Sequence, residues 1–427
     1  MPRSHPASTP SWVWNVGATA LAFATYFCMY AFRKPFAAGT YTGEELLGLA
    51  PKTWFVTSQI AGYAASKYLG LRLVSEAPRK RRLPLLLGLI AAAELALIGF
   101  AILPLPLKVV AICLNGLPLG MVWGLVVRYL EGRRSSYFLL AGLSCSFIVA
   151  SGAVKDVGRW LLASGNVPEY WMPALTGLLF LLPFAASAAC LDRFPEPDAA
   201  DVELCTARVP MDSTARGHFF RAMWPGLLPL LAVYLGLTAF RDYRDNYGVE
   251  LFTELGQHSD AALFTRTELT VGVVVLLSMA ALGLVRGRRN GLLLVFGVIG
   301  FGLALIGLAT LTRRLGLCSG ETWMIATGLG TYLAYVPFSS FLFERLMAAT
   351  RFVGTAVFAI NLADAVGYTG SVALQLFKDL GSKHGTRLEF FDNVSYCLGL
   401  GGCLLLGFAA VFFLRQAQLT SRSTHEP

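Results

Sequence analysis

Two arginines in apolar surroundings are the residues of this sequence best suited to chemistry. Arg33 ends the stretch that begins at Tyr26, Arg241 ends the stretch that begins at Tyr234, and both fit the pattern Tyr-x-x-x-x-Ala-Phe-Arg. On a helix, the tyrosine that opens each stretch shares a face with the arginine that closes it. A guanidinium offers a fixed fork of N–H donors that matches a phosphate or a carboxylate. The repeat therefore predicts two matching halves whose arginines face one anionic ligand.

A second role for each arginine stays open at this point. Arg241 directly precedes Asp242 and lies near Asp245, so it could neutralise a local acid, and either arginine could extend its charged end to the membrane surface. We favour ligand contact, because an ionisable group inside a membrane span is costly unless it faces a wet cavity or a partner.

Polar residues on other apolar segments complete the predicted site. Lys67 shares a helical face with Tyr63, and its ammonium could hold a second phosphate oxygen or pair with Asp364. The segment around Asp364 has a polar stripe that indicates a cavity lining or an interhelical hydrogen-bond seam. Asp364 could accept a coupling proton or act as a counter-charge. The predicted substrate-binding residues are Arg33, Arg241, Lys67, Tyr26, Tyr30, Tyr63, Tyr234, Asn361 and Tyr368.

The charge balance of this set predicts an anionic ligand. Glu94 is left out because its segment is expected at the periphery, and Lys155 and Asp156 are left out because they could pair with each other. What is left is four cations against one acid, namely Arg33, Lys34, Lys67 and Arg241 against Asp364.

Composition places these residues in a membrane. The chain has 427 residues, of which 55% are hydrophobic and 14% charged, and its mean hydropathy is +0.59. A soluble protein of this size could not bury so much apolar surface. The formal net charge is +9, but the basic residues cluster in short connections between apolar segments. That distribution is typical of membrane topology and not of a nucleic-acid-binding face.

Apolar segments of about 20 residues are long enough to cross a bilayer. Twelve such spans are predicted, with approximate limits 12–37, 53–74, 83–103, 108–129, 136–160, 170–191, 222–244, 264–285, 290–311, 321–343, 351–377 and 391–414.

The spans divide into two groups of six. An acidic connection with three prolines separates them, and Gly116-Leu117 in span four has a counterpart in Gly328-Leu329 in span ten. We predict an N-terminal six-helix bundle over 1–191, a cytoplasmic linker over 192–221 and a C-terminal six-helix bundle over 222–427. The fold class is an all-α polytopic membrane protein whose bundles are related by a pseudo-two-fold axis, the plan of the major facilitator superfamily. Lys and Arg are concentrated in connections on one side, which predicts cytoplasmic termini. For such a transporter we expect a plasma (bacterial inner) membrane location.

Other classes of function are disfavoured by what the sequence lacks. It has no G-x-x-x-x-G-K-[ST] phosphate loop and no Cys-x-x-Cys pair, and its five histidines fall in predicted loops, tails or span edges. ATP hydrolysis, histidine-based metal chemistry and a nucleophile triad are therefore not expected. We expect neither an enzyme nor a bound cofactor or metal.

Three stretches resemble the organophosphate:phosphate antiporters, the glycerol-phosphate and hexose-phosphate carriers of the major facilitator superfamily. Residues 30–36, Tyr-Ala-Phe-Arg-Lys-Pro-Phe, are similar to their first helix, residues 61–70 to their second, and residues 115–123 to their fourth. Arg241, preceded by Val233-Tyr234, looks like their second phosphate-binding arginine on helix seven. Two arginines clamp the phosphate in that family, so the resemblance implies this role for Arg33 and Arg241. The sequence departs from the family at Gly124-Leu125, where paired prolines are usual, and at residues 144–146, where a histidine is usual.

Two hypotheses for function follow. The first is a secondary transporter that moves a small organic anion, expected to be phosphorylated, by alternating access, with phosphate or a proton as coupling ion. The second is a transporter-derived membrane sensor or accessory protein that binds a ligand without net transport. Under both, the partners are a small anion and the lipid bilayer, nucleic acid is not a partner, and the protein is expected to be a monomer.

Overall fold

The computed structural model describes residues 11–43, 45–75, 78–130, 136–164, 167–194, 213–257, 262–285, 287–350, 356–381 and 385–422. Within these ranges the regular structure is helical, apart from one isolated bridge between Leu46 and Leu49.

The first half of the chain forms six long helices and one short one. Their bounds are α1 (Ser11–Tyr30), η1 (Pro35–Ala38), α2 (Pro51–Ser75), α3 (Arg79–Ile102), α4 (Leu105–Leu130), α5 (Ser136–Ser164) and α6 (Met172–Asp192).

The second half repeats this plan with three π-helical turns in its last helices. Its elements are α8 (Ser213–Asn246), α9 (Gly248–Glu254), α10 (Leu263–Leu284), α11 (Arg288–Arg314), α12 (Gly320–Pro337), η2 (Phe338–Leu342), α13 (Phe343–Thr350), α14 (Ala356–Leu376), η3 (Phe377–Gly381), α15 (Arg387–Tyr396), η4 (Cys397–Gly401) and α16 (Gly402–Arg422).

Ten of the twelve predicted spans fall on one of these helices or on a continuous run of them. Span 12–37 is interrupted between Tyr30 and Pro35, and the first residues of span 351–377 lie outside the described part of the chain. Seven helices of the described part are long and apolar enough to cross a membrane, and a shorter apolar helix covers Val16–Tyr30. The seven are Arg79–Ile102, Leu105–Leu130, Met172–Asp192, Phe220–Asn246, Leu263–Leu284, Arg289–Arg314 and Arg387–Gln418.

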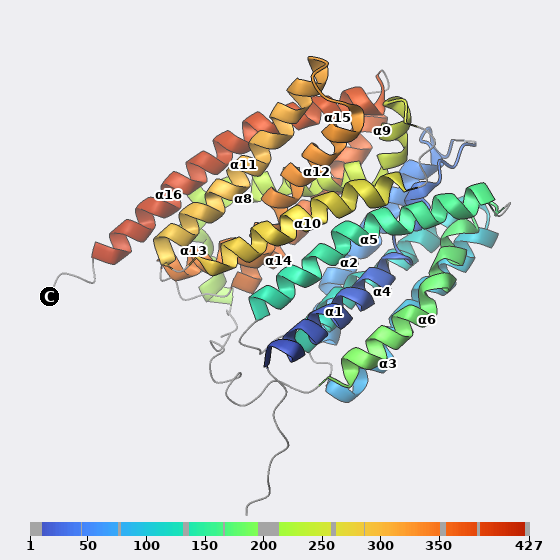
Figure 1. Ribbon diagram of the computed structural model, residues 1–427, viewed down its shortest axis with the longest axis horizontal. Coiled ribbons are helices and arrows are strands. Elements are labelled where there is room, and N and C mark those ends of the chain that lie inside the picture. The colour runs from blue at the N-terminus through green and yellow to red at the C-terminus, as the bar shows by residue number, and fades with distance from the viewer. Residues whose placement is uncertain are drawn as a thin grey trace, which may run out of the picture.

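The two halves lie side by side, with the blue to green helices on one side and the yellow to red helices on the other (Figure 1). They meet where α5 packs against α10 and where α2 packs against α14. The start of α1 and the end of α16 lie at one end of the molecule, whereas α9 and the start of α15 lie at the opposite end (Figure 1). We call this opposite end the distal end.

The predicted linker 192–221 overlaps described structure at both of its borders. Helix α6 ends at Asp192, and α8 begins at Ser213, well before the predicted start of span seven. Residues 195–212 lie outside the described part of the chain. The division into 1–191 and 222–427 stays a prediction.

Glycines allow α2 and α4 to approach each other closely. A Cβ added at Gly62 would meet the carbonyl oxygen of Cys113, and one added at Gly116 would meet the carbonyl oxygen of Gln59. Gly116 and Gly120 are four residues apart, the small-xxx-small spacing that lets membrane helices touch backbone to backbone. This contact fixes the helix that carries Gln59 and Tyr63 against the rest of the first bundle.

We predict that Gly116→Ala lowers thermal stability, because its new methyl group would push α4 away from the Gln59 carbonyl. Such overpacking costs about 1–3 kcal/mol. Gly88→Ala is the matched control, since open space surrounds that helical glycine. The melting temperature of each purified variant measures the effect, and equal melting temperatures for the two variants would contradict this account of the contact.

Candidate functional site

The end of α1 is held by two amide side chains from neighbouring helices. Helix α1 ends at Tyr30, and the proline at position 35 has no N–H with which to continue the hydrogen-bond ladder. Asn115 Nδ2 donates to the Phe32 carbonyl at 3.0 Å, and Gln59 Nε2 donates to the Arg33 carbonyl at 2.8 Å. Gln59 Nε2 also donates to Asn115 Oδ1 at 2.9 Å. The two amide side chains thus satisfy the carbonyls of the turn that follows α1, and the backbone of Arg33 is fixed.

Arg33 packs against tyrosine rings. Its side chain is buried, with Cζ 3.9 Å from the ring centroid of Tyr63 and 5.6 Å from that of Tyr30. Nη1 donates a long hydrogen bond of 3.5 Å to the Tyr30 hydroxyl. The Tyr26 ring packs edge-on against Tyr30 with centroids 5.6 Å apart, and Tyr63 packs against Tyr368 of the second half at 5.3 Å. Within the described residues, Nε of Arg33 has no hydrogen-bond partner and no carboxylate forms an ion pair with its guanidinium.

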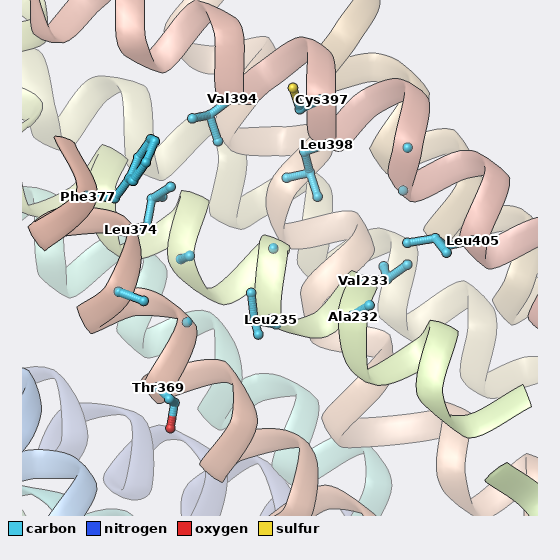
Figure 2. Close-up of a pocket in the computed structure, with 16 residues that line it drawn as sticks. Ala232, Val233, Leu235, Thr369, Leu374, Phe377, Val394, Cys397, Leu398 and Leu405 are labelled. Carbon is cyan, nitrogen blue, oxygen red and sulfur yellow. The ribbon is translucent and has the colours of Figure 1, made fainter. Parts of the chain in front are cut away.

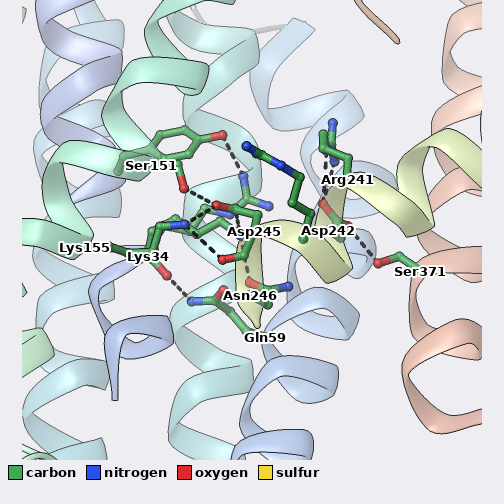
Figure 3. Close-up of polar contacts among 12 residues, drawn as sticks. Lys34, Gln59, Ser151, Lys155, Arg241, Asp242, Asp245, Asn246 and Ser371 are labelled. Atoms are coloured by element: carbon green, nitrogen blue, oxygen red, sulfur yellow. Dashed lines mark hydrogen bonds and ion pairs between the residues drawn. The ribbon is translucent and has the colours of Figure 1, made fainter. Parts of the chain in front are cut away.

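Arg241 has a different environment from Arg33 despite the repeated sequence. Its Nε and Nη2 donate to Oδ1 of Asp242 at 3.2 and 2.8 Å, and its Cζ lies 4.2 Å from the Tyr335 ring centroid. The second oxygen of Asp242 accepts a hydrogen bond of 2.8 Å from Ser371. Figure 3 shows Arg241, Asp242 and Ser371 in this row. In this conformation the contacts of Arg241 therefore fit the alternative interpretation, in which Arg241 neutralises a local acid.

The two arginines nonetheless border one layer of tyrosines. Tyr30 interacts electrostatically with both Arg33 and Arg241. Tyr368 likewise interacts with Arg33 and with Arg241. Both arginines thus lie near the same tyrosines, and their joint contact with one ligand stays a prediction.

Asp364 and Tyr234 contact each other directly. The Tyr234 hydroxyl donates to Asp364 Oδ1 at 2.6 Å and lies 3.1 Å from the Tyr335 hydroxyl. The Asp364 carboxylate thus has a phenol as its hydrogen-bond partner. The side chains of Lys67 and Asn361 lie outside what the structure describes, so their predicted roles stay predictions.

Sequence reasoning missed a cluster of ions that joins the two halves. Asp245 of α8 lies between two lysines, with Oδ2 2.5 Å from Nζ of Lys34 and Oδ1 2.8 Å from Nζ of Lys155 (Figure 3). Lys34 also donates to Asn246 Oδ1 at 2.9 Å, and Ser151 donates to Asp245. Both lysines are buried, the side chain of Asp245 is 12% exposed, and the cluster ties the end of α1 and the middle of α5 to α8.

Further contacts join the halves toward the distal end. Lys52 Nζ lies 2.5 Å from Glu250 Oε1, and the Thr53 hydroxyl donates to Asp379. Asp156 accepts hydrogen bonds of 2.6 Å from both the amide and the hydroxyl of Thr265. These contacts close the molecule between its halves at this end.

Two expectations about charge are corrected by these contacts. Lys155 pairs with Asp245 and Asp156 bonds to Thr265, so the two do not serve as each other's main partner. The balance of four cations against one acid is also wrong, because α8 continues to residue 246 and brings two more carboxylates between the halves. In the described residues of this charged layer, four cations face three acids, namely Arg33, Lys34, Lys155 and Arg241 against Asp242, Asp245 and Asp364.

The sequence contains a signal that these two acids share a helical face with Asn246. Residues 241–246 read Arg-Asp-Tyr-Arg-Asp-Asn, and Asp242, Asp245 and Asn246 follow the i, i+3, i+4 spacing of one helical face. Ending span seven at residue 244 placed Asp245 and Asn246 outside the helix, so Asp242 and Asp245 were considered only as local partners for Arg241. Hydropathy falls where a membrane helix becomes polar, which is why the predicted span ends there.

An apolar groove of about 650 Å³ lies elsewhere, between α8, α14 and the segment from α15 to α16 (Figure 2). Its walls carry no charged side chain, and Thr369 supplies a hydroxyl among small and aliphatic residues. This surface does not suit an anion, so the charged layer is the better candidate site.

Comparison with known proteins places the chain in a family. A family model described as a family of unknown function, DUF5690, matches residues 35–416. The chain belongs to the DUF5690 family. No curated protein matches this DUF5690 chain.

Solved structures show which fold this DUF5690 chain has. A D-xylose–proton symporter matches with a TM-score of 0.61 and 13% identity, over 93% of this chain and 97% of that chain. The peptide transporter POT in complex with alafosfalin matches with 0.61 and 14%, over 97% of each chain. A bacterial homologue of the human drug peptide transporters matches with 0.60 and 12%, over 96% and 100%. The chain is thus an all-α multi-pass membrane protein with the major facilitator superfamily fold, and the resemblance to organophosphate antiporters stays a prediction.

We predict that Asp245→Asn strongly destabilises this closed conformation, because it leaves Lys34 and Lys155 buried without their carboxylate. Breaking a buried ion pair from one side costs about 3–5 kcal/mol. Glu321→Gln is the control, since it removes an ion pair to Arg266 whose side chains are 28% and 53% exposed and whose contribution is about 0–1 kcal/mol. Thermal melting in lipid nanodiscs measures both, and a loss in D245N no larger than in E321Q would refute this role of Asp245.

Proposed function

We propose that this protein is a secondary transporter that moves a small organic anion by alternating access. Transport is what the names of the compared structures describe for proteins with this fold, a sugar–proton symporter and peptide transporters among them. The fold supplies two bundles with a charged layer between them, and rocking one bundle against the other exposes such a layer to either side in turn.

The buried guanidinium of Arg33 is the observation that carries the anion assignment. A buried cation is costly unless it is paired, yet the described neighbours of Arg33 are tyrosine rings and hydroxyls. Within the part of the chain that the structure describes, its Nε donor has no hydrogen-bond acceptor. An anionic group beside Arg33 would supply the missing counter-charge and acceptor, and the tyrosine hydroxyls would bond to the rest of the ligand.

Arg241 adds a second contact that the ligand must compete for. Its guanidinium is held by Asp242, which is itself oriented by Ser371. A ligand oxygen that approached Arg241 would exchange with the carboxylate of Asp242, and the released carboxylate would keep its bond to Ser371. This exchange would link occupancy of the layer to the position of α8.

The chemistry of the ligand follows from two arginines and the tyrosine hydroxyl groups beside them. A phosphate ester or a carboxylate accepts bidentate bonds from a guanidinium, and the resemblance of residues 30–36 to the organophosphate carriers favours a phosphorylated metabolite. The coupling ion is phosphate in exchange, or a proton carried by Asp364. With cytoplasmic termini, the closed distal end would face away from the cytoplasm.

Uptake by proteoliposomes tests the proposal. Phosphorylated and carboxylated metabolites are first screened for the thermal stabilisation that binding confers, and flux of each stabilising compound is then measured. Arg33→Ala should lower the uptake rate at subsaturating substrate at least about tenfold, since a hydrogen bond to a charged group contributes about 1.5–3 kcal/mol.

Two controls complete this experiment. Arg33→Lys keeps the charge but loses the fork, and its uptake should lie between that of the wild type and that of R33A. Arg314→Ala removes a half-exposed arginine outside the charged layer and should leave uptake unchanged. Undiminished uptake by R33A would refute the role of Arg33, and binding without flux in the wild type would favour a sensor.

A further inference from the structure

A carboxyl group without a partner lies inside the first bundle. Glu94 is on α3, in a helix apolar enough to span the membrane, and is only 5% exposed. Among the described residues, neither of its side-chain oxygens has a hydrogen-bond partner. The predicted site did not include this residue.

A glycine of the facing helix makes room for this carboxyl. A Cβ at Gly177 of α6 would overlap Oε2 of Glu94 and would lie 3.0 Å from a ring carbon of Phe32. The Glu94 carboxyl therefore occupies a notch between α3 and α6 that a glycine leaves open, beside the end of α1.

The charged groups of the surrounding helices are directed elsewhere. From α1, Arg33 contacts Tyr63 and Lys34 contacts Asp245. From α4, Lys108 donates to the carbonyls of Phe100 and Ala101 at the C-terminal end of α3. Asp192 of α6 accepts from Tyr129 at the last turn of that helix, and the basic residues of α3 itself, 79–82, lie in its first turn.

Burial without a partner determines the charge state of this group. Burial away from water and without a partner disfavours the ionised form of a carboxyl group relative to its neutral form, so the group tends to take up a proton. We propose that Glu94 is a proton-binding site of the first bundle and carries a proton in this closed conformation. The reaction is the addition of one proton from solvent to a carboxylate oxygen, with no other bond changed.

The notch is connected to the charged layer through the end of α1. Asn115 Nδ2 donates both to the carbonyl of Ala93, which precedes Glu94, and to the carbonyl of Phe32, which precedes Arg33. Phe32 also forms one wall of the notch. A shift of the end of α1 would alter the surroundings of Glu94, so we infer that proton binding at Glu94 is linked to the position of Arg33.

Infrared spectroscopy of the full chain in lipid nanodiscs tests this site with the proton itself as ligand. A protonated carboxyl has a C=O stretch that an ionised one lacks. In mildly acidic buffer the wild type should show a protonated-acid band that is missing from Glu94→Gln, a substitution that keeps size and neutrality.

Glu268→Gln is the matched control for this measurement. Glu268 is also 5% exposed, but its carboxylate forms an ion pair with the guanidinium of Arg244 at 2.6 Å. This variant should retain the band. Gly177→Ala should shift the band, because the added methyl group displaces the carboxyl from its notch.

The spectra decide the proposal independently of transport. A band equally strong in the wild type and in E94Q would overturn it, as would a band lost in E268Q instead. If the band is present but its change with alkaline buffer is the same with and without Arg33→Lys, the link to α1 is refuted. Failure of uptake in R33A experiments would leave the Glu94 spectra unaffected, so the two proposals fail separately.

Discussion

One carboxylate between two lysines holds the two halves of this protein together. Asp245 of α8 contacts Lys34 from the end of α1 and Lys155 from α5, so three helices meet at a single buried charge. Removing all three charges from water is costly, and pairs of this kind often contribute little net stability. Their value lies in specificity, because the ions satisfy one another only when the bundles are closed at the distal end. Opening that end must break or hydrate the cluster, which suits a contact that has to form and separate repeatedly.

The two repeated arginines show how a duplicated motif can acquire unequal roles. Both lie beside the same tyrosine layer, but Arg241 has an acidic neighbour in its own helix and Arg33 has a lysine in the same position. The lysine reaches across to α8, whereas the aspartate folds back onto its own arginine. As a result, one arginine is neutralised within the protein and the other is left to tyrosines. A ligand would therefore meet one open cation and one that it must share.

Polar groups inside this fold are sorted by whether a partner from another helix can reach them. Gln59 and Asn115 satisfy the carbonyls at the end of α1, and Ser371 satisfies Asp242 across from α14. Glu94 is similarly buried, but its carboxyl faces Gly177 and Phe32, which offer it no hydrogen-bonding side chain. In a membrane, with no water to compensate, this difference separates an ionised carboxylate from a protonated one.

The sequence by itself determined most of the helices, and it identified the two arginines and the tyrosines that lie beside them. Apolar length and helical periodicity are local properties, so the spans, the pair of arginines and the tyrosines on their faces could be read from it. The partners of the charged side chains could not be read from the sequence. That Arg241 bonds to Asp242 and that Lys34 and Lys155 share Asp245 depend on where α8 ends and on how α1, α5 and α8 cross. That Glu94 has no hydrogen-bond partner among the described residues depends on how α3 and α6 pack beside the end of α1. Those are decided by side-chain packing between segments far apart in the chain, and a difference of one helical turn in α8 changes which charges meet.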